Sequence, residues 1–191
     1  MFDMGPYYLT ALVNLLGPVA DVAGSVSTTR KQRIITSQPK YGQLIDVEVP
    51  THVTGILNFE NGAIGTIITS FDVYGGNVPF IEVYGTLGSL SVPDPNTFGG
   101  PVKIKIRGKD WAEIPLTHIY NENSRGIGVA DMAYALRTGR ENRCSGRLAC
   151  HILEIMHGIH IAAENKTGYT VKTKCSRPEP LPVNLLYGRL D

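Results

Sequence analysis

The sequence is short of the features that assign a chain at once to a membrane, to secretion or to nucleic acid. No apolar run approaches the roughly 20 residues of a membrane span, and the N-terminus lacks the basic and apolar regions of a signal peptide. The three cysteines (Cys144, Cys150 and Cys175) form no C-x-x-C pair, so we expect free thiols. Charge of one sign is also lacking, because 18 Lys and Arg balance 17 Asp and Glu. These absences predict a cytoplasmic, soluble protein with no nucleic-acid or membrane partner.

The sequence has helical patterns near both ends and, between them, the alternation of apolar and polar residues that is typical of strands. Pro6 favours the first turn of a helix whose apolar stripe runs to Leu16, and Gly17 is expected to end it in the left-handed conformation. From Ala20 to about Ile114 the apolar period is two, which is typical of strands. The expected strands are residues 51–59, 63–74, 80–84, 89–92 and 102–107, with tight turns at residues 60–62 and 85–88.

Helices return in the last third of the chain. Ser124 and Ser145 are expected to cap them, and Gly139 to end the first. After Gly168 the chain becomes rich in proline, so residues 170–191 are expected to form an extended tail. The order of elements, with turns in place of helical crossovers, predicts an α+β fold: an open, mostly antiparallel β-sheet with helices packed on one face.

The last expected helix carries His151, Glu154, His157 and His160 at steps of three. Each step turns roughly 300° around a helix, so the four side chains fan across about half of its circumference and cannot converge on one ion. We therefore expect a polar flank opposite the Leu and Ile stripe, and no metal site.

The helices are too few to cover both faces of the expected sheet. An apolar sheet face left open usually signals association. We therefore expect a homo-oligomer through the sheet face, with the β-branched strands 51–59 and 63–74 contributing most.

Three motifs, taken in their order and spacing, resemble those of one family of oxidoreductases. The segment DMGPYYLT at residues 3–10, followed by LLG at residues 15–17, is similar to a D-x-G-x-H-x-x-D…LG signature. FENGA at residues 59–63 resembles an F-x-N-G-A hairpin, and YGTLGSL at residues 84–90 resembles a G-T-x-G-x-L hairpin. The family is that of glucose–fructose oxidoreductase and inositol dehydrogenase (Gfo/Idh/MocA), and the resemblance spans nearly the whole chain.

The resemblance implies that residues 1–191 are a single C-terminal, dihydrodipicolinate-reductase-like domain for substrate binding and oligomerisation. In this family a Rossmann domain precedes it and binds NAD or NADP. The chain has no G-x-G-x-x-G between a strand and a helix, so that Rossmann domain is absent here. The implied substrate is a sugar, polyol or related carbinol or carbonyl compound, and the chain alone is expected to be inactive.

The family's site residues transfer only partly to this sequence. Asp3 matches the first aspartate of the signature, Tyr7 stands where the histidine is found, and Thr10 stands where the second aspartate is found. The resemblance makes Tyr7 and Asp3 catalytic candidates and Thr10 a substrate-binding one, since a phenol can move a proton when a nearby ammonium lowers its pKa. The alternative is that Tyr7 and Tyr8 are packing residues, and that Asp3 is a carboxylate favoured by the helix dipole.

Three residues after the expected sheet are further substrate-binding candidates. His118 and Tyr120 lie in a polar, aromatic loop of the kind that carries binding residues over a rigid scaffold, and Arg125 suits an anionic group. The alternatives are an incidental surface loop and an exposed arginine at the start of a helix. The departures at Tyr7 and Thr10 also leave open a non-catalytic relative that acts as a ligand sensor or as an assembly module.

Overall fold

The computed structural model describes all residues, 1–191, and divides the chain into two compact units. Unit 1 comprises Met1–Gly76 and Arg147–Arg177, and unit 2 comprises Asn77–Gly146 and Pro178–Asp191. No helix in the chain is long and apolar enough to cross a lipid bilayer.

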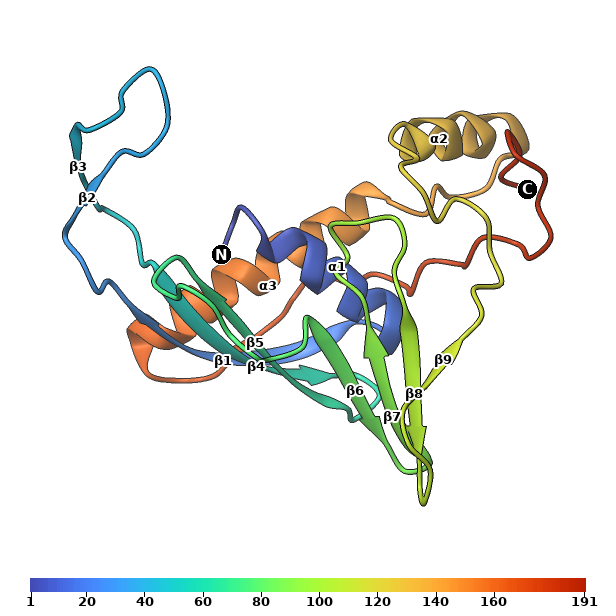
Figure 1. Cartoon of the computed structure of the whole chain (residues 1–191), viewed down its shortest axis with the longest axis horizontal. Coiled ribbons are helices and arrows are strands. Elements are labelled where there is room, and N and C mark those ends of the chain that lie inside the picture. The colour runs from blue at the N-terminus through green and yellow to red at the C-terminus, as the bar shows by residue number, and fades with distance from the viewer. The chain divides into compact units, whose positions relative to one another are not determined.

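Unit 1 combines a four-stranded sheet and a two-stranded hairpin with two helices (Figure 1). Its sheet has the strand order β10-β1-β4-β5, and every pairing is antiparallel. The elements of unit 1 are α1 (Gly5–Leu16), β1 (Val19–Ser27), β2 (Gln32–Ile34), β3 (Leu44–Asp46), β4 (His52–Phe59), β5 (Ile64–Ser70), α3 (Gly146–Asn165) and β10 (Tyr169–Thr170).

The core of unit 1 lies between the two helices and one face of this sheet. Alternate residues of β4 point inward, so Val53 and Leu57 are buried while Ile56 is half exposed on the other face. Gly24 lets α3 approach β1 closely, because a Cβ there would lie 2.6 Å from the carbonyl oxygen of Ile159. The core residues are Leu9, Val13, Val19, Val22, Val53, Leu57, Phe59, Ile67, Leu148, Ile152, Ile155, Met156, Ile159 and Val171.

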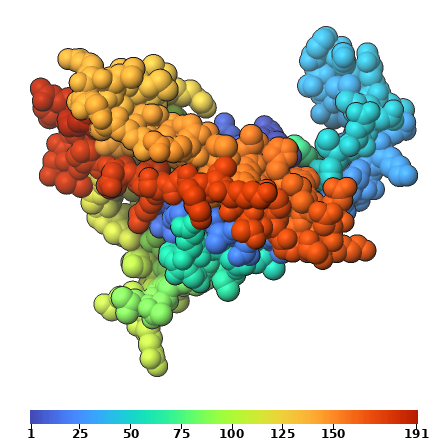
Figure 2. All heavy atoms as spheres, turned by 180° about the vertical axis from the view of Figure 1, so that it is seen from behind, coloured from blue at the N-terminus to red at the C-terminus, as the bar shows by residue number.

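Strands β2 and β3 form a separate two-stranded hairpin. It lies within residues 28–50, between β1 and β4, and we call this segment the arm. Figure 2 shows the arm, in light blue, projecting from the body of unit 1. The sequence-based expectations named no strand in this segment.

Unit 2 contains a second antiparallel sheet, one helix and the C-terminal segment. The strand order follows the sequence, β6-β7-β8-β9. Its elements are β6 (Ile81–Gly85), β7 (Gly88–Val92), β8 (Val102–Ile106), β9 (Ala112–Ile114) and α2 (Ile127–Thr138). Residues after β10 form no further helix or strand.

The predicted α+β class and antiparallel pairing are confirmed, but three local expectations are wrong. Ser124 does not cap α2; the N-cap is Gly126, whose φ of 98° suits glycine and not serine. Gly17 ends α1 with φ 92° but ψ −172°, so it lies outside the left-handed helical region. The strands also form two four-stranded sheets, β10-β1-β4-β5 and β6-β7-β8-β9, in place of a single one.

The expected polar flank of α3 is also wrong at His151, which is fully buried. Its Nε2 accepts a hydrogen bond from the backbone N–H of Val19 at 3.0 Å, and its Nδ1 lies 3.2 Å from the carbonyl oxygen of Thr173. This arrangement requires the proton on Nδ1, and burial lowers the pKa of the ring. His151 is therefore a neutral core residue that ties α3 to two other segments of unit 1.

Candidate functional site

The first candidate site is the start of α1, which unit 1 anchors at both ends. Near the N-terminal end Gly5 is buried, and a Cβ on it would lie 2.8 Å from the sulfur of Met1. At the C-terminal end the Asn61 side chain donates to the carbonyl oxygen of Leu16 at 2.9 Å. Asn61 belongs to the FENGA turn, where Gly62 has φ 87°. The turn motif therefore holds the helix that carries the candidate residues.

The two tyrosines of this helix face different surroundings. Tyr8 is half-buried and packs against the core of unit 1. Tyr7 is 45% exposed, and its hydroxyl makes no hydrogen bond within the chain. The packing alternative therefore describes Tyr8 well and Tyr7 poorly, because Tyr7 presents a free phenol on a fixed helix.

Asp3 and Thr10 lie on either side of Tyr7 along the chain. Asp3 is exposed in the turn before α1, and α1 has neither a side-chain cap nor an acidic residue in its first turn. Asp3 is therefore not the N-cap; it lies one residue before the N-cap Met4, at the end of α1 where the helix dipole favours a carboxylate. Thr10 follows Tyr7 by three residues and is half-buried, so the two are neighbours on the helix surface. Tyr7, Asp3 and Thr10 remain predicted site residues.

Aromatic and imidazole rings gather just before Asp3, a feature that the sequence analysis missed. Phe2 stacks on His160 with ring centroids 5.4 Å apart, and it contacts His157 at 4.9 Å. The Nε2 of His160 is buried without a hydrogen-bond partner, and burial is the largest cause of its lowered pKa. The three-residue step between the two histidines predicts that they are neighbours, but the sequence does not reveal Phe2 as their partner.

Two of the candidates in unit 2 hold its C-terminal segment in place. Nε2 of His118 lies 2.8 Å from the carbonyl oxygen of Leu181, and its Nδ1 lies 2.9 Å from the Thr117 hydroxyl. The Tyr120 hydroxyl donates to the carbonyl oxygen of Arg189 and accepts from the N–H of Gly188. The polar atoms of both side chains are thus already used within the unit.

Arg125 is different, since it is exposed and has no ion-pair or hydrogen-bond partner within the chain. It lines an open hollow of about 570 Å³ in unit 2, together with Phe98 and three asparagine side chains. The lining also includes Glu122, whose carboxylate offsets the charge of Arg125, so the amides, the aromatic ring and the two charged groups suit a polyhydroxylated compound. Of the three candidates in unit 2, Arg125 alone therefore keeps its charged group available to a ligand.

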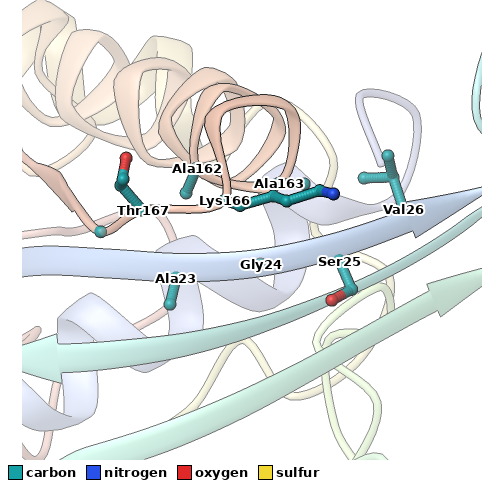
Figure 3. Close-up of a pocket in the computed structure, with 9 residues that line it drawn as sticks. Ala23, Gly24, Ser25, Val26, Ala162, Ala163, Lys166 and Thr167 are labelled. Atoms are coloured by element: carbon teal, nitrogen blue, oxygen red, sulfur yellow. The ribbon is translucent and has the colours of Figure 1, made fainter.

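A second hollow, of about 520 Å³, lies in unit 1 between β1 and the end of α3 (Figure 3). The side chain of Lys166 extends from the end of α3 along β1, and it is the single charged group in the lining. The rest of the wall consists of small residues such as Ala162 and Ala163. This hollow has too few polar groups to orient a substrate.

Neither unit brings together three or more His, Cys, Asp or Glu residues that could hold a metal ion. The chain also offers no dinucleotide site, because no helix follows a strand through a glycine-rich turn. α1 precedes the first strand, α2 follows β9 after the loop of residues 115–126, and α3 follows α2.

Comparison with known proteins finds a family model that matches part of the chain. Residues 1–91 match the sequence model of the GFO/IDH/MocA C-terminal domain, which confirms the predicted resemblance in that part of the chain. No curated protein matches the sequence.

Solved structures share the fold at low sequence identity. Levoglucosan dehydrogenase in its apo form is 18% identical with a TM-score of 0.72, and the match covers 91% of this chain and 51% of that one. An NAD binding oxidoreductase from Klebsiella pneumoniae is 19% identical with a TM-score of 0.69, over 90% and 50% of the two chains. An aldose-aldose oxidoreductase from Caulobacter crescentus complexed with glycerol is 20% identical with a TM-score of 0.63, and the match covers 88% of this chain and 46% of that one. The chain therefore spans about half the length of the structures that it matches.

Proposed function

Residues 1–91 of this chain match the GFO/IDH/MocA C-terminal domain, and from this premise we propose that the chain is the substrate-binding and oligomerisation half of an oxidoreductase. The proposed enzyme uses NAD or NADP and acts on a sugar, polyol or related carbinol or carbonyl compound. The similar structures include one of levoglucosan dehydrogenase with NADH and levoglucosan, which supports a sugar-like substrate.

The cofactor does not fit this chain, which lacks a phosphate-binding turn at the start of a helix. Its binding is therefore assigned to a preceding half, and this chain alone is expected to be inactive. What this half supplies is a group that exchanges a proton with the substrate hydroxyl, together with groups that orient the substrate.

The exposed side chain of Tyr7, whose hydroxyl has no hydrogen-bond partner within the chain, is the observation that carries the proposal. Tyr7 would take the proton from a carbinol oxygen during oxidation and return it during reduction. A neighbouring ammonium from the preceding half would lower the pKa of the phenol enough for this exchange. Asp3 would accept a hydrogen bond or orient that ammonium, and Thr10 would contact the substrate. His118, Tyr120 and Arg125 remain proposed substrate contacts, with Arg125 the best placed to bind a ligand.

We also infer homo-oligomers through the outer face of the sheet of unit 1. This face carries three exposed side chains on adjacent strands: Ile56 on β4, and Ile64 and Ile68 on β5. They are 48–74% exposed, so the face offers a ready apolar contact.

The departures at Tyr7 and Thr10 favour one alternative, a non-catalytic relative that binds a ligand or a partner. The two functions separate in an assay of the full-length protein against a panel of sugars and polyols, followed by nicotinamide absorbance. Turnover is expected, whereas binding of a sugar without turnover would favour the sensor. Micromolar binding of NADH to this chain alone, measured by calorimetry, would contradict the assignment of the cofactor to the preceding half.

A further inference from the structure

The edge of β1 that faces away from β4 is covered along only part of its length. The carbonyl oxygen of Ala20 accepts a hydrogen bond from the N–H of Val171 at 2.9 Å. The two-residue strand β10 pairs with β1 as far as Val22, which lies opposite Tyr169. Before Tyr169 the chain belongs to the turn that leads out of α3. Residues 23–27 of β1 therefore have a neighbouring strand on the β4 side alone.

The uncovered part of this edge carries backbone groups without a partner. In an antiparallel ladder, successive residues direct their N–H and C=O groups to opposite sides. Val22 directs its groups toward β10, and the register with β4 is regular from Val22 to Ser27, so Gly24 and Val26 direct theirs to the same free side. No hydrogen bond within the chain reaches these groups. A free row of backbone donors and acceptors is a template for one further strand.

The open hollow of about 520 Å³ in unit 1 lies against this free edge (Figure 3). Residues 23–26 of β1 form one wall, and Ala162, Ala163 and the turn at residues 166–168 form the other. A Cβ on Gly168 would meet only the carbonyl oxygen of Val22, at 3.9 Å, so the turn does not crowd the edge. The free backbone groups thus border open space.

One cation, Lys166, accompanies this edge. Its backbone is fixed at the end of α3, with φ 55°, and the next N–H, that of Thr167, donates to the carbonyl oxygen of Ala162 at 3.2 Å. Its side chain runs along β1 and has no ion pair or hydrogen bond within the chain (Figure 3). Glu164, two residues earlier, does not line the hollow. An unpaired ammonium beside the edge favours a carboxylate in a chain that pairs there.

We propose that residues 23–26 of β1 are a docking site for an extended, acidic segment of a partner protein, which adds a strand to the sheet of unit 1. The backbone of this segment completes the hydrogen bonds of Gly24 and Val26, and one of its carboxylates pairs with Lys166. Its side chains alternate between α3 and solvent, and those that face the small residues of α3 are themselves small. Strand addition gains affinity from main-chain hydrogen bonds and specificity from alternate side chains. The site contains none of the candidate residues for catalysis or substrate binding, so the inference does not depend on the proposed function.

Fluorescence anisotropy with labelled peptides and the chain of residues 1–191 tests the docking. The probes are capped octapeptides of alternating alanine and threonine, with one glutamate moved through each position of the series, and the same peptides with glutamine are the neutral controls. The best glutamate peptide is expected to bind with a dissociation constant of about 100 µM or below. Its glutamine counterpart should bind about 3–5-fold more weakly. Absence of binding by every peptide at about 1 mM would overturn the proposal.

Two substitutions separate the contribution of the edge from that of the charge. Val26→Pro removes an N–H on the free edge, where proline is tolerated, and should weaken binding at least about 10-fold. Val26→Ala is the matched control, because it removes apolar bulk but keeps the N–H, and it should bind like the wild type. Lys166→Asn suits the left-handed end of α3 and should abolish the preference for glutamate over glutamine. Tighter binding of both peptides to Lys166→Asn would mean that Lys166 shields the edge from pairing, which would contradict the proposal.

Amide hydrogen exchange, followed by NMR, identifies the binding mode in the wild-type chain. With saturating glutamate peptide, the amides of Gly24 and Val26 should exchange at least about 10-fold more slowly, while those of Ala23 and Ser25, which point toward β4, should change little. Unchanged exchange at Gly24 and Val26 despite binding would place the peptide elsewhere and overturn the proposal. Slow exchange of these two amides without peptide, in a chain that sediments as a dimer, would show a second copy on the edge and would also overturn it.

Discussion

The two units are stabilised by different kinds of interaction. In unit 1, two helices cover one sheet face, and side chains such as Leu9, Leu57 and Ile155 are completely buried. In unit 2 the only buried apolar residues are Ile81, Ala135 and Leu190, and most of β8 is exposed. Polar interactions therefore contribute a larger share of the stability of unit 2. Where the apolar core is small, ion pairs and hydrogen bonds to the C-terminal segment must fix the structure.

The central polar cluster of unit 2 surrounds Asp131. Its buried carboxylate accepts hydrogen bonds from the guanidinium groups of Arg140 and Arg143, and Arg140 also pairs with Asp191. Burial by itself would raise the pKa of Asp131, but these hydrogen bonds outweigh it and hold the pKa below its usual range. Asp131 thus joins α2 to the segment after it, and the arginines of that segment extend the cluster to the end of the chain.

The same apolar truncation should have unequal effects in the two sheets. Leu57→Ala leaves a cavity in the closed core of unit 1 and is expected to cost about 3–4 kcal/mol of unfolding free energy. Leu90→Ala, on the half-buried strand β7 of unit 2, should cost less than about 1 kcal/mol. Urea denaturation followed by far-ultraviolet circular dichroism measures both. Equal losses would contradict the contrast between the units.

Breaking the ionic cluster should affect unit 2 alone. Asp131→Asn leaves Arg140 and Arg143 without their buried partner, and we expect a loss of about 2–3 kcal/mol in unit 2. Trp111 is the single tryptophan and lies in unit 2, so its fluorescence reports on that unit. The fluorescence transition should shift to lower urea while amide exchange in α3 stays unchanged. A simultaneous shift of both would show that the units unfold together.

In unit 1, Glu154 of α3 makes a strongly acid-sensitive contact. Burial raises the pKa of this carboxyl, but hydrogen bonds from Thr173, Lys172 and Tyr169 outweigh that effect and lower it to about 2. Because the folded pKa lies below the unfolded one, the stabilisation is complete above about pH 4.5 and is lost as the pH falls toward 2. We expect a loss of about 1–2 kcal/mol at pH 3. Thermal unfolding between pH 3 and pH 6 measures it. The Glu154→Gln variant should show a flatter profile, and an equally steep one would exclude Glu154.

How far the sequence predicts this fold depends on whether an element's partners lie nearby. Strand β4, the FENGA turn and β5 are adjacent along the chain and alternate clearly, so residues 51–59 and 63–74 were placed well, although β5 ends at Ser70. The buried position of His151 was missed because one of its partners, Val19, is 132 residues away. The arm was missed because its apolar side chains have no core to face, which removes the alternation with polar residues.

The same dependence on nearby partners holds for the residues of the candidate site. The motif around Asp3 led to Tyr7, and the structure adds that Tyr7 points outward while Tyr8 packs inward. Sequence reasoning could not separate Arg125 from His118 and Tyr120, because the hydrogen bonds that occupy the latter two come from residues 181–189, far along the chain.

The most direct test of the proposed role of unit 1 compares two tyrosines in the full-length oxidoreductase. Tyr7→Phe removes only the hydroxyl, and turnover should fall about 10²–10⁴-fold with an unchanged melting temperature, as expected for a positioned acid or base. Tyr8→Phe is the matched control, one residue along the same helix, and should keep near-normal turnover. Full activity of Tyr7→Phe would contradict the account and return Tyr7 to the role of a surface aromatic residue.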